Sequence, residues 1–322
     1  MAMTFPPNST ALYQDKPVTV SCYTPDGVQI EKDGELLTVS ESELMPTGMT
    51  TPLPELAVSI RQREAVTLLI ANNAGGVGKT SITVALAHQL SLWGLRVAVL
   101  DFDPQANATT FSGVLRQIEP DETFDRMVRN PGAVFPDLIS VHGYELLPAS
   151  AVLRQTSRDL ARLDDYTLLI PHMTDLKERY DLVLIDCGPS LDPLAMTGAM
   201  AADYVVTPSS TSVKGVDGFG GVAEFVTEIN ALGNPDLQIC LYIPTLHTKR
   251  TKAEAEAHAA MVANLPAHLL AMPILRNQKW VDATRQGQPV TLHAPKSAAA
   301  QQVERLAREL ITAIGWDGDH DG

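Results

Sequence analysis

The sequence is poor in cysteine, in aromatic residues and in long apolar runs, and each shortage excludes a class of protein. Its three cysteines, Cys22, Cys187 and Cys240, are too few and too widely spaced for a disulfide framework or a thiol metal cluster. Aromatic residues make up only 5% of the chain, which suits an α/β core of Ala, Val and Leu better than a β-sandwich. No apolar run reaches membrane-spanning length. These features favour a protein of a reducing compartment, which we expect to be the cytoplasm.

An overall excess of positive charge is also missing, because 38 acidic residues outnumber 24 basic ones and give a net charge of −14. Taken as a whole, this charge disfavours a nucleic-acid binder. The distribution is uneven, however, since residues 240–310 carry nine Lys or Arg against five Asp or Glu. That segment is either a surface for an acidic partner or a helix-rich end with ordinary surface charge.

Neither end of the chain has the pattern of a membrane-targeting segment. Residues 1–15 lack the basic start and the apolar stretch of a signal peptide. Residues 315–322, GWDGDHDG, are acidic and rich in glycine, whereas a membrane-surface anchor is basic and amphipathic. We therefore expect no membrane partner, and we expect residues 315–322 to be an acidic flexible tail.

Residues 1–62 differ in pattern from the rest of the chain. Proline clusters there, and the segments VTVSCY, GVQIEKD and ELLTVS alternate polar and apolar residues between Asp-Gly turns. This pattern predicts a small β-meander. Such a sheet is too small to be stable alone. We expect an N-terminal extension that docks on the main domain or stays partly disordered.

Residues 63–314 alternate short apolar strands with helical patterns, which predicts one α/β domain. The strands read as almost continuously apolar, so both faces of their sheet should be covered by helices. The fold class is therefore a doubly wound, mostly parallel twisted sheet flanked by helices. The predicted strands are 66–72, 96–101, 144–149, 181–186, 203–208, 237–244 and 269–274, and the predicted helices are one ending at Gly94 and others near 151–163, 167–179, 218–231, 252–264 and 297–313.

The segment AGGVGKTS at residues 74–81 predicts a phosphate-binding loop, because it follows the first predicted strand and opens a helix. Its glycines allow backbone N–H groups to close around phosphate oxygens. Lys79 would reach the β- and γ-phosphates of ATP, and the Thr80 hydroxyl would ligate Mg²⁺. The residues assigned to nucleotide binding are Ala74, Gly75, Gly76, Val77, Gly78, Lys79, Thr80 and Ser81.

Carboxylates stand at the ends of two further predicted strands. Asp101 and Asp103 lie in VLDFDPQANAT, and Asp186 lies in YDLVLIDCGPSLD. Ligands of open α/β sheets bind beyond the carboxyl ends of the strands, so these side chains should face the phosphate loop. The alternative is a capping or turn role for each aspartate.

The three motifs, in this order and spacing, resemble the ParA/MinD family of deviant Walker ATPases over residues 65 to 313, and the DPQ sequence favours the ParA branch. The resemblance implies that Lys79 and Asp103 are catalytic, with Asp103 positioning the attacking water. It implies that Thr80, Asp101 and Asp186 support Mg²⁺. It also implies an ATP-bound homodimer, binding to non-specific nucleoid DNA, and a small adaptor protein that stimulates hydrolysis.

One position departs from the family pattern, because Ala74 stands where the signature lysine reaches the partner's phosphates. Its loss would leave charge uncompensated in a dehydrated interface. We hypothesise that Lys214, flanked by Gly215, supplies this charge and is catalytic in trans; a solvated surface lysine is the alternative. In lacking the signature lysine, the sequence also resembles the McdA subgroup, whose members space carboxysomes over the nucleoid. It likewise resembles plasmid-partition homologues that lack the lysine.

The resemblance further implies basic residues on the rim of the dimer that contact DNA phosphates without reading bases. The matching candidates are Lys249, Arg250, Lys252, Lys279 and Arg285. Arg250 also falls near the family's adenine pocket, for which Arg276 and Asn277 are weaker candidates.

The sequence therefore predicts a bacterial, cytoplasmic, nucleoid-associated ATPase that positions or partitions a cargo, either plasmid DNA or a carboxysome-like compartment. The alternative is a nucleotide-binding scaffold or regulator of the same fold without significant turnover, which Ala74 favours. Retention of Lys79, Thr80, Asp103 and Asp186 opposes that alternative. A metabolic or metal-handling ATPase of this fold has no supporting residues.

Overall fold

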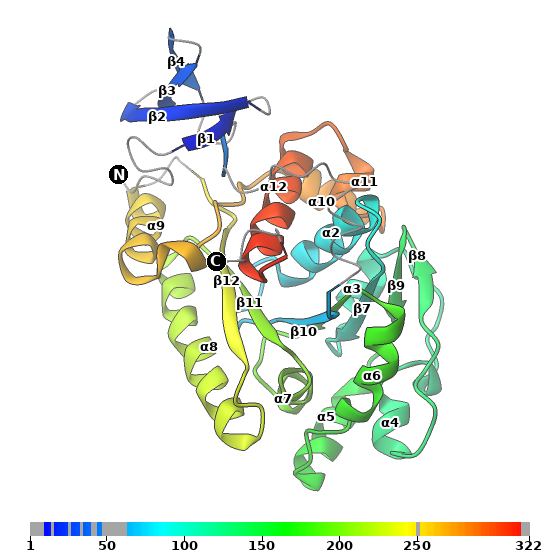
Figure 1. The fold of residues 1–322 in the computed structure, drawn as a ribbon. Coiled ribbons are helices and arrows are strands. Elements are labelled where there is room, and N and C mark those ends of the chain that lie inside the picture. The colour runs from blue at the N-terminus through cyan, green and yellow to red at the C-terminus, as the bar shows by residue number, and fades with distance from the viewer. Residues whose placement is uncertain are drawn as a thin grey trace.

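The computed structural model describes residues 10–13, 16–24, 27–32, 35–39, 44–46, 63–248 and 252–316, with only the backbone at 10–13, 16–24, 27–29, 35, 39, 44–46, 213–219 and 252–253. A seven-stranded sheet in the order β12-β11-β6-β10-β7-β9-β8 forms its centre (Figure 1). All neighbours are parallel except the β8–β9 pair. Its strands are β6 (Val66–Ile70), β7 (Val97–Phe102), β8 (Ile139–Val141), β9 (Tyr144–Leu147), β10 (Leu182–Cys187), β11 (Tyr204–Ser210) and β12 (Gln238–Thr245).

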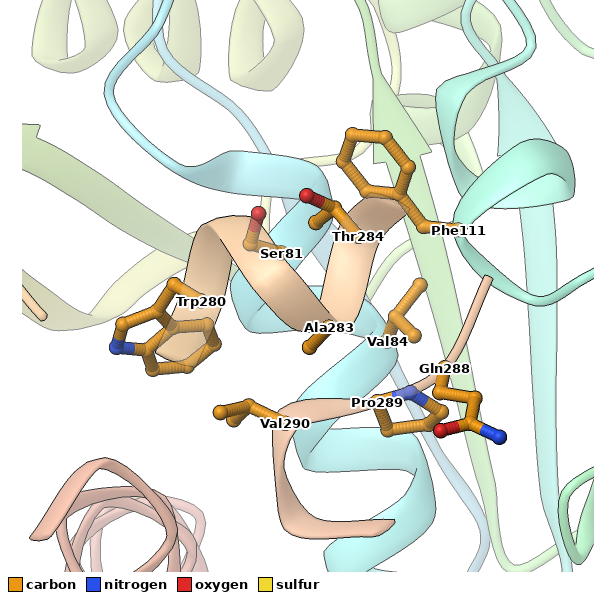
Figure 2. A pocket seen from close by; sticks show the side chains of 9 residues that line it. All are labelled: Ser81, Val84, Phe111, Trp280, Ala283, Thr284, Gln288, Pro289 and Val290. Atoms are coloured by element: carbon orange, nitrogen blue, oxygen red, sulfur yellow. The ribbon is translucent and has the colours of Figure 1, made fainter. Parts of the chain in front are cut away.

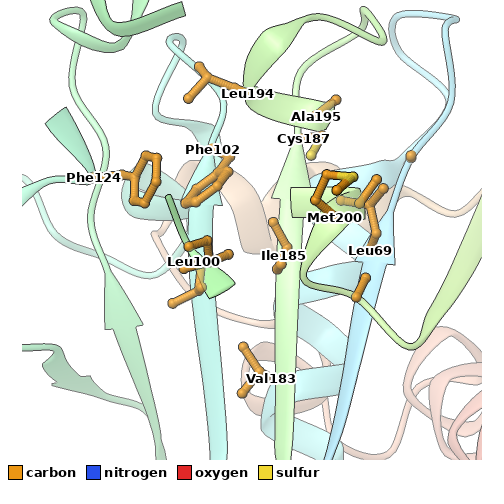
Figure 3. Close-up of a cluster of buried hydrophobic side chains, with 14 of the residues drawn as sticks. Leu69, Leu100, Phe102, Phe124, Val183, Ile185, Cys187, Leu194, Ala195 and Met200 are labelled. Carbon is orange, nitrogen blue, oxygen red and sulfur yellow. The ribbon is translucent and has the colours of Figure 1, made fainter. Parts of the chain in front are cut away.

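Helices cover both faces of this sheet, as the apolar strands predict. One core joins the sheet to α2 and α12, and a second joins it to α4 to α8. Figure 3 shows part of the second core, where Phe102 and Ile185 of the sheet meet Phe124 and Met200. The helices are α2 (Lys79–Leu92), α3 (Asn107–Phe111), α4 (Asp125–Arg129), α5 (Leu153–Leu163), α6 (Ile170–Arg179), α7 (Pro193–Met200), α8 (Val213–Leu232), α9 (Lys252–Asn264), α10 (Gln278–Arg285), α11 (Val290–His293) and α12 (Ala298–Ala313). Among the described helices, none is long and apolar enough to cross a membrane.

Six of the seven predicted strands are present, but the prediction of a strand at 269–274 is wrong. Residues Ala267–Leu269 form a 3₁₀ turn, and Leu270 makes only an isolated bridge to Tyr242. Pro273 has no amide hydrogen, so it cannot continue a ladder along β12. The seventh strand is instead β8, which pairs antiparallel with β9 through a two-residue turn at His142 and Gly143. Both turn residues have positive φ, 45° and 88°, as a type I′ hairpin requires.

The β-rich N-terminal extension is confirmed as a separate five-stranded antiparallel sheet (Figure 1). Its order is β4-β3-β2-β1-β5, with β1 (Thr10–Tyr13), β2 (Lys16–Thr24), β3 (Gly27–Lys32), β4 (Glu35–Val39) and β5 (Leu44–Pro46). The predicted meander corresponds to β2, β3 and β4, whereas β1 and β5 were not predicted. Docking of residues 1–62 on the main domain stays a prediction, and residues 317–322 of the acidic tail lie outside the described residues.

Helix α2 is buried around nearly its whole circumference, rather than along one apolar stripe. It begins after Gly78, at φ 92°, and ends before Gly94, at φ 86°. Every residue from 82 to 90 is buried, including the polar Thr83, His88 and Gln89. The His88 Nδ1 atom lies 2.7 Å from the Thr291 hydroxyl at α11. A helix this enclosed holds the loop before it in place, and it buries one histidine, His88.

Burial of His88 makes the stability of the fold depend on pH. Burial, together with the charge of His142, lowers the pKa of His88 from 6.5 to about 4. Since the folded-state pKa lies below the unfolded one, this stabilisation is complete above pH 6.5 and is lost as the pH falls toward 4. Between pH 7 and pH 5, the free energy of unfolding should fall by about 2 kcal/mol more in the wild type than in His88→Gln. Urea denaturation at both pH values measures this, and equal losses in the two proteins would contradict it.

Candidate nucleotide-binding site

The predicted phosphate loop connects β6 to α2 at the carboxyl edge of the sheet. The side chain of buried Asn72 fastens it at its start: Nδ2 donates to the Pro208 carbonyl of β11 at 2.9 Å, and Oδ1 accepts from the Ala74 amide at 2.8 Å. Gly76 and Gly78 have φ of 72° and 92°, a left-handed backbone that favours glycine. The loop therefore has the backbone shape that phosphate cradling requires.

Lys79 lies at the start of α2 and is almost fully buried. Its Nζ donates to the carbonyls of Asn72 at 3.0 Å and of Ala74 at 2.9 Å. Burial lowers the pKa of Lys79, and the negative charge of Asp186 opposes that shift. The ammonium thus bonds to the residues at the start of the loop. It lies near the positive end of α2, where an anion is favoured.

Asp186 is fully buried at the end of β10, directly opposite Asp101 of β7. Its Oδ2 accepts from the Thr80 hydroxyl at 2.8 Å, and its Oδ1 lies 2.9 Å from the Thr83 hydroxyl. Burial, then the charge of Asp101, raises the pKa of Asp186 to about 8. A cation beside this carboxylate would favour its ionised form.

The Thr80–Asp186 pair fits a magnesium ion. A hydroxyl and a carboxylate are hard oxygen donors, and Mg²⁺ is usually held by one or two protein oxygens together with waters and substrate phosphates. Among the described residues, no three His, Cys, Asp or Glu side chains gather into a complete metal-binding group.

Asp101 is occupied by the protein itself. Its carboxylate accepts from the Thr109 amide at 2.8 Å, the Thr109 hydroxyl at 2.7 Å and the Asp103 amide at 3.1 Å. Burial raises its pKa to about 7. These bonds make Asp101 an anchor for the loop that carries Asp103, and its support of Mg²⁺ stays a prediction.

Asp103 directly follows β7, which β10 separates from the strand that precedes the phosphate loop. Its Oδ1 accepts from the Gln105 amide at 2.9 Å, and its Oδ2 accepts from the Asn107 side chain at 3.3 Å. A Cβ on Gly188 would lie 3.3 Å from Asp103 Oδ1, and a Cβ on Gly75 would lie 3.6 Å from the Pro189 ring. The structure therefore gathers Asp103, the turn after β10 and the phosphate loop into one place.

The predicted lysine substitute and most of the predicted DNA contacts fall where the structure describes little. Lys214 is in the first turn of α8, but its side chain lies outside the described residues, as does that of Lys252 at the start of α9. Lys249 and Arg250 lie wholly outside them. The roles of all four stay predictions.

The remaining predicted residues lie on α10 or just before it. Asn277 caps α10 by accepting from the Lys279 amide at 2.9 Å, which is a structural role for its side chain. Arg276, Lys279 and Arg285 have exposed side chains. The Arg276 amide donates to the His247 carbonyl at 3.0 Å, so this segment lies along the end of β12.

Several residues that hold the site were not predicted from the sequence. Thr83 follows Thr80 by one helical turn, a spacing that places both hydroxyls on the face toward Asp186. Thr245 at the end of β12 donates to the Val77 carbonyl at 2.6 Å and so ties that strand to the phosphate loop. Asn72 is a polar residue directly after an apolar strand, which is a signal that the sequence does carry.

A water-sized cavity of about 10 Å³ lies between α2 and the segments around α3 and α10 (Figure 2). Ser81 and Val84 of α2, Phe111 of α3 and Trp280 of α10 are among its lining residues. It is too small for a nucleotide, so it marks a junction of α2, α3 and α10 and not the binding site.

Known proteins resemble this chain over most of its length. A family model described as an AAA domain matches residues 65–239. The chromosome-partitioning ATPase Soj of Thermus thermophilus is 34% identical over 255 residues, covering 77% of this chain and 96% of Soj. The structure of an ATP complex of a Cyanothece McdA variant has a TM-score of 0.66 at 26% identity, covering 78% of this chain and 97% of that one. Cobyrinic acid a,c-diamide synthase of Mycobacterium smegmatis, with ADP and magnesium, has a TM-score of 0.63 at 27% identity, covering 77% and 94%.

The bond from Thr83 to Asp186 should be measurable as stability. Thr83→Val keeps the shape of the side chain but removes its donor, so a buried carboxylate oxygen loses a partner. We expect the free energy of unfolding to fall by about 1–3 kcal/mol, whereas the control Thr83→Ser, which keeps the hydroxyl, should lose less. Chemical denaturation of the three proteins tests this. A valine variant as stable as the wild type would show that Asp186 does not depend on Thr83.

Proposed function

Because the chain belongs to the ParA/MinD-type ATPase family, we propose that it hydrolyses ATP in a Mg²⁺-dependent reaction and uses the cycle to position or partition a cargo. The observation that carries the proposal is the pairing of the Thr80 hydroxyl with the buried Asp186 carboxylate beneath a glycine-rich loop. That arrangement offers oxygen donors for a cation beside backbone N–H groups for phosphates.

The chain's own groups divide the work of hydrolysis. The loop amides and the Lys79 ammonium would bind phosphate oxygens, with the ammonium exchanging its bonds to the Asn72 and Ala74 carbonyls. Thr80 and Asp186 would hold Mg²⁺, which supplies neutralising charge at the phosphates. Asp103 would orient a water molecule through its carboxylate, since it lies beside the turn after β10 and its position is fixed by Gln105 and Asn107. Positioning and charge are most of what phosphoryl transfer requires.

Two copies of the chain would form a dimer when ATP is bound. Lys214 would then supply the positive charge of the signature lysine, whose place Ala74 takes. The middle of α8 lies near the residue before the phosphate loop, because a Cβ on Gly221 would lie 2.7 Å from Asn73 Nδ2. Lys214 is seven residues before Gly221 on the same helix. A lysine about two helical turns before that contact would reach an interface formed over the loops.

The dimer would bind DNA through the basic C-terminal part of the chain. Lys279 and Arg285 present exposed side chains on α10, and Lys279 lies 4.0 Å from the Asp282 carboxylate, a distance typical of a weak surface pair. Contacts to phosphate alone would be strongly dependent on salt. A small adaptor protein would stimulate hydrolysis and release the dimer from the nucleoid, and the cargo is a plasmid or a protein compartment.

A scaffold without turnover is the second candidate function, and Ala74 is the observation that favours it. Such a protein would bind nucleotide without the charge needed in trans for hydrolysis. The connected network around Asp103 weighs against it, because a scaffold needs no group to orient water.

Light scattering with ATP and Mg²⁺ tests the dimer and its lysine together. Asp103→Ala should be a stable dimer, because nucleotide binds but is not consumed. Asp103→Ala/Lys214→Ala should remain a monomer, since charge in the closed interface is left unpaired. Asp103→Ala/Lys296→Ala, which removes an exposed lysine of the 240–310 segment, is the matched control and should dimerise.

The same samples, mixed with non-specific duplex DNA, separate the two candidate functions. Binding that requires ATP, appears only in the dimeric variants and weakens steeply with salt supports positioning on the nucleoid. A protein that binds ATP but stays monomeric and does not bind DNA would contradict the positioning function and support the scaffold function.

A further inference from the structure

Two glycines from distant parts of the chain meet backbone to backbone behind Asp103. Gly113 follows α3, and Gly287 lies between α10 and α11. A Cβ built on Gly287 would lie 2.7 Å from the Gly113 Cα atom, and one built on Gly113 would lie 2.9 Å from the Gly287 carbonyl oxygen. Both have positive φ, 62° and 80°. No other residue fits at either position without moving a backbone.

The β8–β9 hairpin adds a third element to this junction. His142 at its turn places Nε2 3.0 Å from the Gly287 carbonyl oxygen. The hydroxyls of Ser112 and Tyr144 lie 2.6 Å apart in a buried contact one residue before Gly113. The C-terminal end of α3 is thus held by β9 on one side and by the α10–α11 connection on the other.

The opposite end of α3 holds the two aspartates of the site. Asn107, its first residue, donates to Asp103 Oδ2, and Thr109 donates twice to Asp101. The Thr109 hydroxyl also accepts from the Ala149 amide at 2.9 Å, so α3 is also tied to the segment just after β9. Since α3 is only five residues long, a shift at Gly113 cannot be absorbed within the helix before it reaches Asp103.

We propose that Gly113, Gly287 and His142 are positioning residues for ATP hydrolysis: they fix the far end of α3, and α3 holds Asp103 in place. The inference rests on the proposed hydrolysis of ATP. None of the three touches the phosphate loop, so they act on the water-orienting carboxylate and leave nucleotide binding to the loop itself.

Gly287→Ala and Gly315→Ala form a matched pair that tests this. Both glycines have positive φ, 62° and 72°, so alanine brings similar backbone strain to each. Only at Gly287 does the added Cβ meet another backbone, because nothing lies within 4 Å of a Cβ on Gly315. We expect Gly287→Ala to lower kcat at least tenfold with the KM for ATP within threefold, and Gly315→Ala to change both less than twofold.

Hydrogen exchange of the amides at 103–111 provides a readout that needs no turnover. Exchange there should rise at least tenfold in Gly287→Ala and stay at the wild-type rate in Gly315→Ala. If Gly287→Ala does not fold, the His142 variants carry the test. His142→Gln, which keeps a donor for the Gly287 carbonyl, should retain kcat, and His142→Phe should lower kcat at least threefold and raise exchange.

The outcomes separate this inference from the proposed function. Unchanged exchange at 103–111, or a loss of kcat shared equally by Gly287→Ala and Gly315→Ala, overturns the positioning role. If exchange rises in Gly287→Ala but the wild type binds ATP without hydrolysing it, the glycine junction still supports α3. The proposed ATPase activity is then overturned.

Discussion

The buried carboxylate of Asp186 is the constraint around which the site is built. It lies near the end of an otherwise apolar strand and in register with Asp101, so two fully buried carboxyl groups lie side by side. A buried carboxyl group needs polar partners, and here these are the hydroxyls of Thr80 and Thr83, with the ammonium of Lys79 nearby. The start of α2 and the ends of β7 and β10 are thereby held at one edge of the sheet. Binding of a cation with phosphate would complete the compensation that the protein supplies only in part.

Residues outside the three sequence motifs also hold the carboxyl edge of the sheet in place. Asp103 is fixed by α3, α3 is fixed by the β8–β9 hairpin and by Gly287, and Gly287 belongs to the connection after α10. The helix with exposed Lys279 and Arg285 therefore shares a support with the Asp103 carboxylate.

The sequence predicts the parts of this site that obey local rules. Glycine at left-handed positions, a carboxylate after an apolar strand and the alternation of strands and helices are all legible without coordinates, and they locate Lys79, Thr80 and Asp186. Gly113, Gly287 and His142 could not be found this way, because their contacts join residues more than 100 positions apart. The wrong strand at 269–274 has a similar cause: its apolar residues pack along β12, but Pro273 and the preceding 3₁₀ turn prevent a ladder.

Calorimetric titration of ATP into the wild type and Asp186→Asn, each with Mg²⁺ and with EDTA, tests the central claim most directly. The account predicts one ATP per chain in the wild type with Mg²⁺, and an affinity at least tenfold weaker in EDTA. It also predicts that Asp186→Asn loses this dependence on Mg²⁺, because the carboxylate beside Thr80 is gone. Absence of ATP binding by the wild type, or binding that is equally tight in all four titrations, would contradict a Mg²⁺–nucleotide site centred on Asp186.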